Sequence, residues 1–221
     1  MSSTTIVSEV IGVATKDLNL LIVQLQAIAQ SGRYYTKDVF DRERYDQLAA
    51  ITKQLVTLLG DATPEQARLF VDQDIGYVTP KVDVRAVTFI DDRLLMVQER
   101  VGETWSIPGG WADLGYSASE IAVKETREEA GLTVKPTRLL AVYSVRKRDY
   151  APQSTRDVYK FFIACEPVSH TLKTGVETEN VKTFSREEAL ALPLSLQRNL
   201  PADVAMAFAA HGVDHWETRF D

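Results

Sequence analysis

The sequence predicts an α+β fold, with a small helical domain followed by a domain that mixes strands with few helices. In residues 1–71 apolar side chains recur at helical spacing, whereas after Pro80 they alternate with charged ones, as is typical of strands. The change falls across the polar segment 72–80, which carries Gly76 and Pro80 and is interpreted as a linker. We therefore expect a helical N-terminal domain at 1–71, a linker at 72–80 and a second domain at 81–221.

Three helices are expected before the linker. The first has apolar positions at helical spacing and is expected to end at Ser31 and Gly32; its apolar residues are Leu18, Leu21, Ile22, Leu25 and Ile28. The second should cover 39–59, with Gly60 just beyond it. Thr63 followed by Pro64 is typical of a helix start, so a short helix should run to about residue 71.

Strands are expected throughout the second domain. Alternation over 82–88, two aspartates and then an apolar run over 94–97 predict a hairpin. Further strand-like runs are 139–145, 158–165 and 181–184, and helices are expected at 117–130 and 201–211. We find no internal repeat.

Composition excludes several classes of function. The 221 residues carry a net charge of −6, and residues 1–80 contribute −3 of it, from seven basic and ten acidic residues. This acidic balance argues against double-stranded DNA as a partner. The longest apolar run, 18–25, is interrupted by Asn19 and Gln24 and is too short to span a membrane. With no signal peptide expected and a single cysteine, Cys165, inside an apolar run, the sequence favours a cytoplasmic protein.

Three carboxylates are expected on one stripe of the helix at 117–130. At about 100° per residue, Glu128 and Glu129 lie within roughly 60° of Glu125, near the unfavourable negative end of the helix dipole. One interpretation is a solvated acidic face, shielded by Lys124 and Arg127. The other is a site for a hard divalent cation, which prefers oxygen ligands.

The segment from Gly109 to Leu132 resembles the Nudix box, the pattern G-x5-E-x7-R-E-U-x-E-E-x-G-U, in which U is bulky and apolar. Aligned on Gly110, the chain matches at Gly110, Glu125, Glu128, Glu129, Gly131 and Leu132. The resemblance implies the family's α/β/α sandwich around a mixed sheet over about 81–221. The first glutamate of the box is replaced by Tyr116 and its arginine by Lys124, and Thr126 occupies an apolar position. Glu120, which is expected to pair with Lys124 at i+4, does not replace the missing glutamate.

The N-terminal half resembles the helical extension that precedes some Nudix domains, on the segments 26–32, Tyr34-Tyr35 and 41–45. That subgroup hydrolyses a nucleoside diphosphate linked to another group, X, and includes CDP-choline and ADP-ribose pyrophosphatases. The resemblance therefore implies a homodimeric pyrophosphohydrolase that releases a nucleoside monophosphate and phospho-X. The departures at Tyr116 and Lys124 leave open a non-catalytic, nucleotide-binding regulatory protein, and RNA processing is a third possibility.

The resemblance also implies the site residues. Glu125, Glu128 and Glu129 are the expected catalytic groups, and the Gly109 carbonyl, Glu125 and Glu129 are the expected ligands of Mg²⁺ or Mn²⁺, with Glu128 a ligand or a neighbour of one. A carboxylate from a later loop is expected to join them; Glu179 is preferred to Glu177, although both could be exposed loop acids.

Candidate substrate-binding residues come from residue type alone. Arg146 and Arg148 form a basic cluster suited to phosphates, with a solvated loop as the alternative. Trp105 and Tyr34 could stack on a base, with core packing as the alternative.

Overall fold

The chain divides into two compact units, Met1–Pro80 and Lys81–Asp221. The computed structural model describes residues 18, 21–22, 24–59, 79–151, 157–169 and 171–221. The expected short helix at 63–71 and all but the end of the linker at 72–80 lie outside the described residues.

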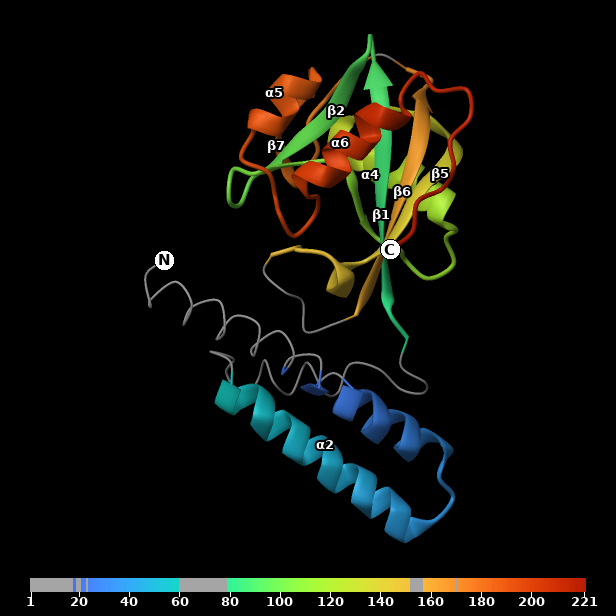
Figure 1. Cartoon of the computed structure of the whole chain (residues 1–221), viewed down its shortest axis with the longest axis vertical. Helices are drawn as coiled ribbons and strands as arrows, with labels where there is room; N and C mark the ends of the chain where they lie inside the picture. The colour runs from blue at the N-terminus through green and yellow to red at the C-terminus, as the bar shows by residue number, and fades with distance from the viewer. Residues whose placement is uncertain (1–17, 19–20, 23, 60–78, 152–156, 170) are drawn as a thin grey trace, which may run out of the picture. The chain divides into compact units, whose positions relative to one another are not determined.

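The described part of the first unit is a pair of packed helices. One covers 24–35, and the other is α2 (Val39–Leu59), drawn in blue and cyan in Figure 1. Asp38 begins α2, because its Oδ1 accepts the backbone N–H groups of Phe40 and Asp41 at 2.8 and 2.9 Å. Ile22 packs with Val56, and Ala29 with Ala49, so the two helices run antiparallel.

The expected helix end at Ser31 and Gly32 is wrong, because the helix continues to residue 35. Gly32 serves packing instead: a Cβ at this position would lie 2.3 Å from a ring carbon of Tyr45. The glycine therefore permits close approach of the two helices. It does not end the first helix, although a glycine at this place in a sequence is typical of a helix end.

The second unit contains the mixed sheet. Its central strand β1 (Lys81–Ile90) pairs parallel with β6 (Val158–Pro167) and antiparallel with β4 (Gly109–Trp111). On the far side of β6 lies β5 (Val134–Ser144), antiparallel to it. The remaining strands pair around β2, which joins the end of β1; they are β2 (Arg93–Glu99), β3 (Trp105–Ser106) and β7 (Thr178–Phe184).

The predicted hairpin between β1 and β2 is confirmed. Its two-residue turn is Asp91-Asp92, and both aspartates have positive φ, 50° and 59°. This is the turn whose twist matches that of the strands, and aspartate tolerates the left-handed region better than most residues.

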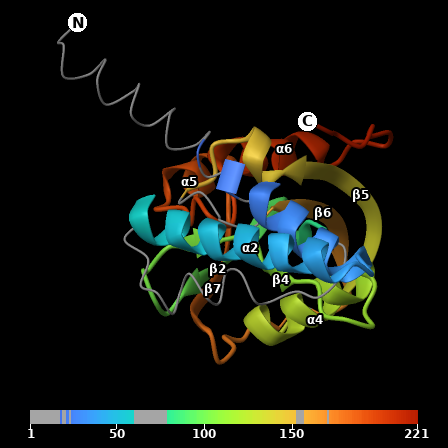
Figure 2. The same ribbon diagram turned by 90° about the horizontal axis from the view of Figure 1, so that it is seen from below.

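Helices cover both faces of the strands. Figure 2 shows α4 (Ala118–Ala130) on one side and α5 (Arg186–Ala191) with α6 (Pro201–Ala210) on the other. Ile121, Ala122 and Ala130 of α4 pack with β1 and β2 residues in one core cluster, whereas Val204 and Ala207 of α6 belong to a second. The fold class expected from the sequence, an α/β/α sandwich with a mixed sheet, is thus confirmed.

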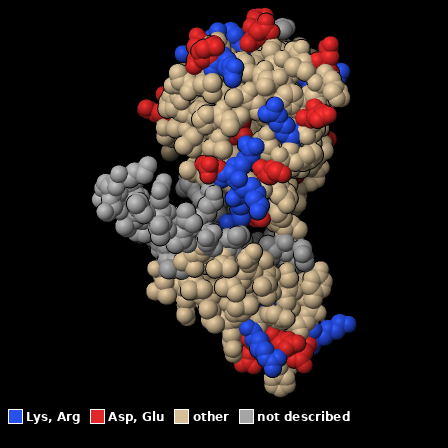
Figure 3. All heavy atoms as spheres, viewed as in Figure 1, with Lys and Arg blue, Asp and Glu red and all other residues tan. Residues whose placement is uncertain are grey.

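The structure adds elements that the sequence did not predict. Three elements, β3, β4 and α5, are too short to show a periodic pattern of apolar residues. Strand β5 begins five residues before the expected strand at 139–145. On the face in Figure 3, the basic side chains of the second unit are interspersed with acidic ones rather than gathered in one broad field. No helix in the described ranges is both long and apolar enough to cross a bilayer.

Candidate active site

Helix α4 presents the three glutamates Glu125, Glu128 and Glu129. Its start is a capping box: the Ser117 hydroxyl accepts the backbone N–H of Glu120, and the Glu120 carboxylate accepts the backbone N–H of Ser117 at 2.8 Å. Glu120 therefore caps the helix and the expected pairing with Lys124 is wrong. Gly131 ends the helix at φ 67°, with its N–H bonded to the Arg127 carbonyl.

The two glycines before the helix hold the backbone against β1 and α4. At Gly109 φ is 150°, and a Cβ would lie 1.9 Å from the Val84 carbonyl oxygen. At Gly110 a Cβ would lie 2.9 Å from Oε2 of Glu125. Neither position accommodates a larger residue without movement, so the glycines bring the β4 backbone directly against a carboxylate of the box.

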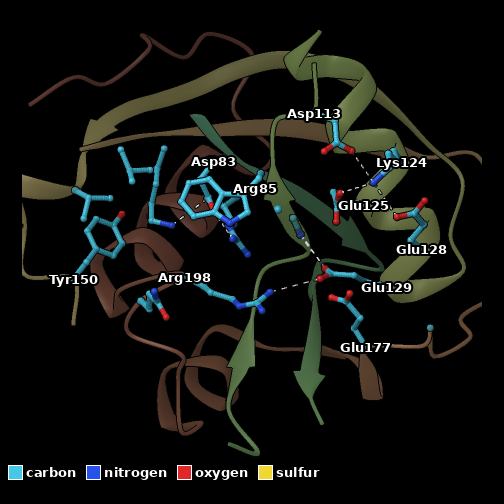
Figure 4. A pocket seen from close by; sticks show the side chains of 18 of the residues that line it. Asp83, Arg85, Asp113, Lys124, Glu125, Glu128, Glu129, Tyr150, Glu177 and Arg198 are labelled. Atoms are coloured by element: carbon cyan, nitrogen blue, oxygen red, sulfur yellow. Dashed lines mark hydrogen bonds and ion pairs between the residues drawn. The ribbon is translucent and has the colours of Figure 1, made fainter. Parts of the chain in front are cut away.

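A cavity of about 650 Å³ opens between these elements. The carboxylates of Asp113, Glu125, Glu128, Glu129 and Glu177 line it, and so do the cationic side chains of Arg85, Lys124, Lys160 and Arg198. Figure 4 shows Asp83, Arg85 and Tyr150 on one side of this cavity, and Glu125 and Glu128 on the other. We call the side formed by Glu125, Glu128 and Glu129 the carboxylate wall.

Lys124 bridges three of the carboxylates that line the cavity. Its Nζ lies 2.9 Å from Glu125 Oε1, 3.0 Å from Glu128 Oε2 and 3.4 Å from Asp113 Oδ2 (Figure 4). These contacts, that with Glu125 first, raise the pKa of Lys124 above its usual range. As the side chains stand, no three His, Cys, Asp or Glu groups of the described residues lie in a geometry that could hold a metal ion.

Glu129 is the buried member of the glutamates. Its Oε2 accepts the Gly109 backbone N–H at 2.9 Å, and its Oε1 lies 3.6 Å from Nη1 of Arg198. Burial, more than the like charge of Glu125, raises the pKa of Glu129 to about 7, although the charge of Arg85 opposes the shift. This carboxyl can therefore exchange a proton near neutral pH.

The loop before β7 and Thr178, the first residue of β7, fix the end of α4. The Thr178 hydroxyl donates to the Glu129 carbonyl at 2.7 Å and accepts the Gly175 N–H at 2.8 Å. A Cβ on Gly175 would lie 1.8 Å from the Glu128 carbonyl, so this loop packs directly on the last turn of the helix. The same loop carries Glu177 to the cavity.

A buried ion cluster forms the opposite side of the cavity. Arg85 donates to both oxygens of Asp83, from Nε at 2.7 Å and from Nη2 at 2.5 Å, and Lys160 Nζ donates to Asp83 Oδ1 at 3.0 Å. All three residues are buried. Burial alone would raise the pKa of Asp83, but the neighbouring cations hold it below its usual value. Burial, followed by the charge of Arg85, lowers the pKa of Lys160 to about 8.

The loop carboxylate on the cavity is Glu177 rather than the preferred Glu179. Glu177 lines the cavity from the loop before β7, whereas Glu179 lies exposed within the strand and is not among the lining residues. Strand position alone did not reveal which acid the loop turns toward the helix.

The four candidate substrate-binding residues are not lining residues of the cavity. Arg148 stacks 3.4 Å over the Tyr143 ring and binds Asp221 at 3.0 Å, while Arg146 lies 3.7 Å from Asp157. Trp105 is buried in the core with its ring edge against Phe184, as the core-packing alternative expected. Tyr34 belongs to the first unit, where it is exposed and packs edge-on against Tyr35.

Sequence reasoning missed Asp83, Arg85, Lys160 and Arg198. The charged residues of β1 alternate with apolar ones, but β1 is central and both of its faces are covered, so Asp83 and Arg85 are buried. A usable signal was the pair Asp83 and Arg85, opposite charges two residues apart and hence on the same face of a strand.

Two family models match the chain. One is described as "UDP-X-like, N-terminal oligomerisation domain" and covers residues 16–70; the other is the NUDIX domain and covers residues 79–203. Together they span most of the chain, in the order that the sequence resemblance implied.

Named relatives agree with these matches. A Bacillus subtilis (strain 168) protein, provisionally named ADP-ribose pyrophosphatase YjhB, is 40% identical over 84% of this chain and 88% of its own. The crystal structure of a Streptococcus suis ADP-ribose pyrophosphatase is 38% identical, with TM-score 0.58, over 65% of this chain and all of that one. The structure of a UDP-X diphosphatase is 27% identical, with TM-score 0.59, over 94% of this chain and 99% of that one. The chain thus belongs to the Nudix hydrolase family, as a pyrophosphohydrolase with a helical region before its Nudix domain.

Proposed function

We propose that this protein hydrolyses the pyrophosphate bond of a nucleoside diphosphate linked to X, with ADP-ribose and CDP-choline as the leading candidates. The observation that carries the proposal is one cavity with a carboxylate wall facing the buried cations Arg85 and Lys160. The guanidinium groups of Arg85 and Arg198 on this cavity suit the anionic diphosphate, and the carboxylates suit its metal counter-ions. The names of the relatives support ADP-ribose as the first substrate to try.

The carboxylate wall has the donor chemistry of a Mg²⁺ or Mn²⁺ site. Glu125, Glu128 and Glu129 supply hard oxygen ligands, and Glu177 lies on the same cavity. The Gly109 carbonyl is a further candidate. Because Lys124 bridges Asp113, Glu125 and Glu128, its ammonium has to leave at least one of them before an ion binds. A bound ion supplies charge neutralisation and orientation of the phosphates.

The reaction forms one bond from a water oxygen to phosphorus and breaks the bond from phosphorus to the bridging oxygen. The water proton passes to a base, and the bridging oxygen leaves on the second phosphate. The base is a carboxylate that lines the cavity and does not hold the ion. The Gly109 N–H and the Thr178 hydroxyl keep Glu129 in place on this cavity.

A substrate panel tests the proposed function. Full-length protein is incubated with ADP-ribose, CDP-choline, a UDP-sugar and a short RNA, with Mg²⁺ or Mn²⁺ or with chelator, and nucleoside monophosphate is measured. We expect metal-dependent release from at least one of the nucleoside diphosphates and none from RNA. Binding without turnover would identify a regulatory protein, and cleavage of RNA alone would identify a nuclease.

Tyr116→Glu is expected to keep the fold and change metal affinity. Tyr116 is exposed and lines a shallow hollow that also includes Lys124, so a carboxylate there can draw this ammonium away from Glu125. We expect tighter Mn²⁺ binding, measured by electron paramagnetic resonance of the free ion. Tyr116→Gln, of similar length but uncharged, is the control; identical Mn²⁺ titrations for both variants and the wild type would contradict the expectation.

We further propose that residues 1–71 form a domain, joined by the linker 72–80, that makes the protein a homodimer. Besides Val39 at its start, α2 leaves three large apolar side chains exposed: Phe40 at 65%, Ile51 at 52% and Leu58 at 78%. At 11 and 7 residues apart they lie within about 20° of one another around the helix. An apolar stripe of this kind suits burial against a second copy, and the description of the matching family model supports a homodimer.

We also propose a cytoplasmic location, with which the buried free thiol of Cys165 accords.

Leu58→Glu is therefore expected to shift the protein from dimer to monomer, because a charge in an apolar interface is left unpaired. The measurement is light scattering at several concentrations. Val101→Glu, at an 87% exposed apolar position of the other unit, is the matched control and should stay dimeric. A wild-type protein that is monomeric at every concentration would rule the proposal out.

A further inference from the structure

The cavity has a second, aromatic end that the chemistry above does not use. Trp111 lines it from β4 and is 50% exposed, although tryptophan has the largest ring system to shield from water. Val145, Tyr150 and Val158 line the same cavity. This end therefore offers flat and apolar surface, in contrast to the carboxylate wall.

Strand register brings Trp111 and Lys160 to the same face of the sheet. Asp83 on β1 is the register partner of Trp111 on β4 and also of Lys160 on β6. Residues opposite one another in a sheet share a face, and neighbouring strands lie about 4.8 Å apart, so the two Cα atoms are about 10 Å apart. The indole and the ammonium therefore project from the same face of the sheet and line one cavity.

Lys160 has donors to offer such a ring. Its ammonium carries three N–H groups, and among the described residues it donates to Asp83, with the Tyr150 ring 5.1 Å away. Both oxygens of Asp83 are already bound by Arg85. Asp83, Arg85 and Lys160 together carry a net charge of +1. Burying N–H donors costs free energy unless an acceptor binds them.

We propose that Trp111 and Lys160 form the nucleobase subsite of this enzyme, with the base stacked on the indole and its edge accepting from Lys160. The proposal rests on the proposed function and names the part of the substrate that this end of the cavity holds. Every base has a π face and an in-plane carbonyl or ring nitrogen, so both contacts are available to a nucleoside, whereas a bare phosphate offers the indole no π face on which to stack.

Fluorescence of the full-length protein tests the stacking. In Mg²⁺ buffer, AMP, CMP and UMP bind without turnover, since they contain no pyrophosphate, and ribose 5-phosphate supplies the same phosphate without a base. We expect nucleoside monophosphates, but not ribose 5-phosphate, to quench tryptophan emission. Trp111→Phe should lose the quench while still binding, whereas the matched variant Trp216→Phe, outside the cavity, should keep it.

Affinity separates the two contacts. Trp111→Ala should weaken nucleoside monophosphate binding, measured by calorimetry, about 10- to 100-fold, and Trp111→Phe should restore much of it. Lys160→Met should weaken it for the nucleotides and leave the weak ribose 5-phosphate binding unchanged. Equal quenching by ribose 5-phosphate, or unchanged affinity in Trp111→Ala, overturns the subsite. Hydrolysis of the panel with unchanged binding in Trp111→Ala would sink this proposal alone, whereas quenching without hydrolysis would sink the proposed function alone.

Discussion

Glu125→Gln and Glu129→Gln are each expected to lower kcat/KM for nucleoside diphosphate hydrolysis by about 10²-fold or more, the scale of losing a positioned acid–base or charge-neutralising group. Glu125 faces the cavity beside Gly110, and Glu129 is held by the Gly109 N–H. Glutamine keeps the shape and helix propensity of glutamate, so the helix should persist. The measurement is initial rate against substrate at saturating Mg²⁺, together with a thermal melt.

Glu166→Gln is the matched control, because Glu166 is an exposed carboxylate on β6 that does not line this cavity. It should retain wild-type kcat/KM. The same assay decides between the loop acids: Glu177→Gln should reduce turnover and Glu179→Gln should not, since Glu177 alone of the two lines the cavity. Wild-type turnover and metal dependence in Glu125→Gln or Glu129→Gln would show that the assignment of that glutamate is wrong.

Gly109→Ala is expected to destabilise the protein by about 3 kcal/mol or more, from overpacking and backbone strain together. Its Cβ would lie 1.9 Å from the Val84 carbonyl and 2.9 Å from the Arg85 Cα, both backbone atoms of β1 that side-chain rotation cannot move away. The backbone conformation, with φ at 150°, is also one that residues with a Cβ rarely adopt. The measurement is the free energy of unfolding in urea.

Gly212→Ala separates the cost of backbone strain from the cost of overpacking. Gly212 also has positive φ, 70°, but a Cβ there meets no atom within 4 Å. We expect a loss of about 1 kcal/mol for this variant, the usual cost of placing a side chain in the left-handed region. If both alanine variants lost the same free energy, the close approach of β4 to β1 would not contribute to stability.

The local sequence pattern was sufficient to predict a feature that lies within one helix, one strand or one turn. The period of 3.6 fixed α2 and α4, and with α4 the placement of Glu125, Glu128 and Glu129 on one side of a helix. The two aspartates between apolar runs fixed the hairpin, because only a few residue types tolerate its positive φ values. The spaced box pattern gave the family for the same reason, since its residues lie on one continuous loop and helix.

Pairing between distant segments decided the rest. Asp83 meets Lys160, 77 residues away, because β1 and β6 are parallel neighbours, and no local period encodes that choice. Central placement of β1 also buried Asp83 and Arg85, which local alternation with apolar residues does not predict. Trp111 rather than Trp105 reached the cavity because Trp105 turns into the core under β2. The sequence by itself determined α2, α4, α6, the hairpin and the carboxylate stripe, which depend on neighbours a few residues apart. Only the tertiary structure decided which cations, loop acid and aromatic ring share the cavity, because those contacts depend on strand order and register.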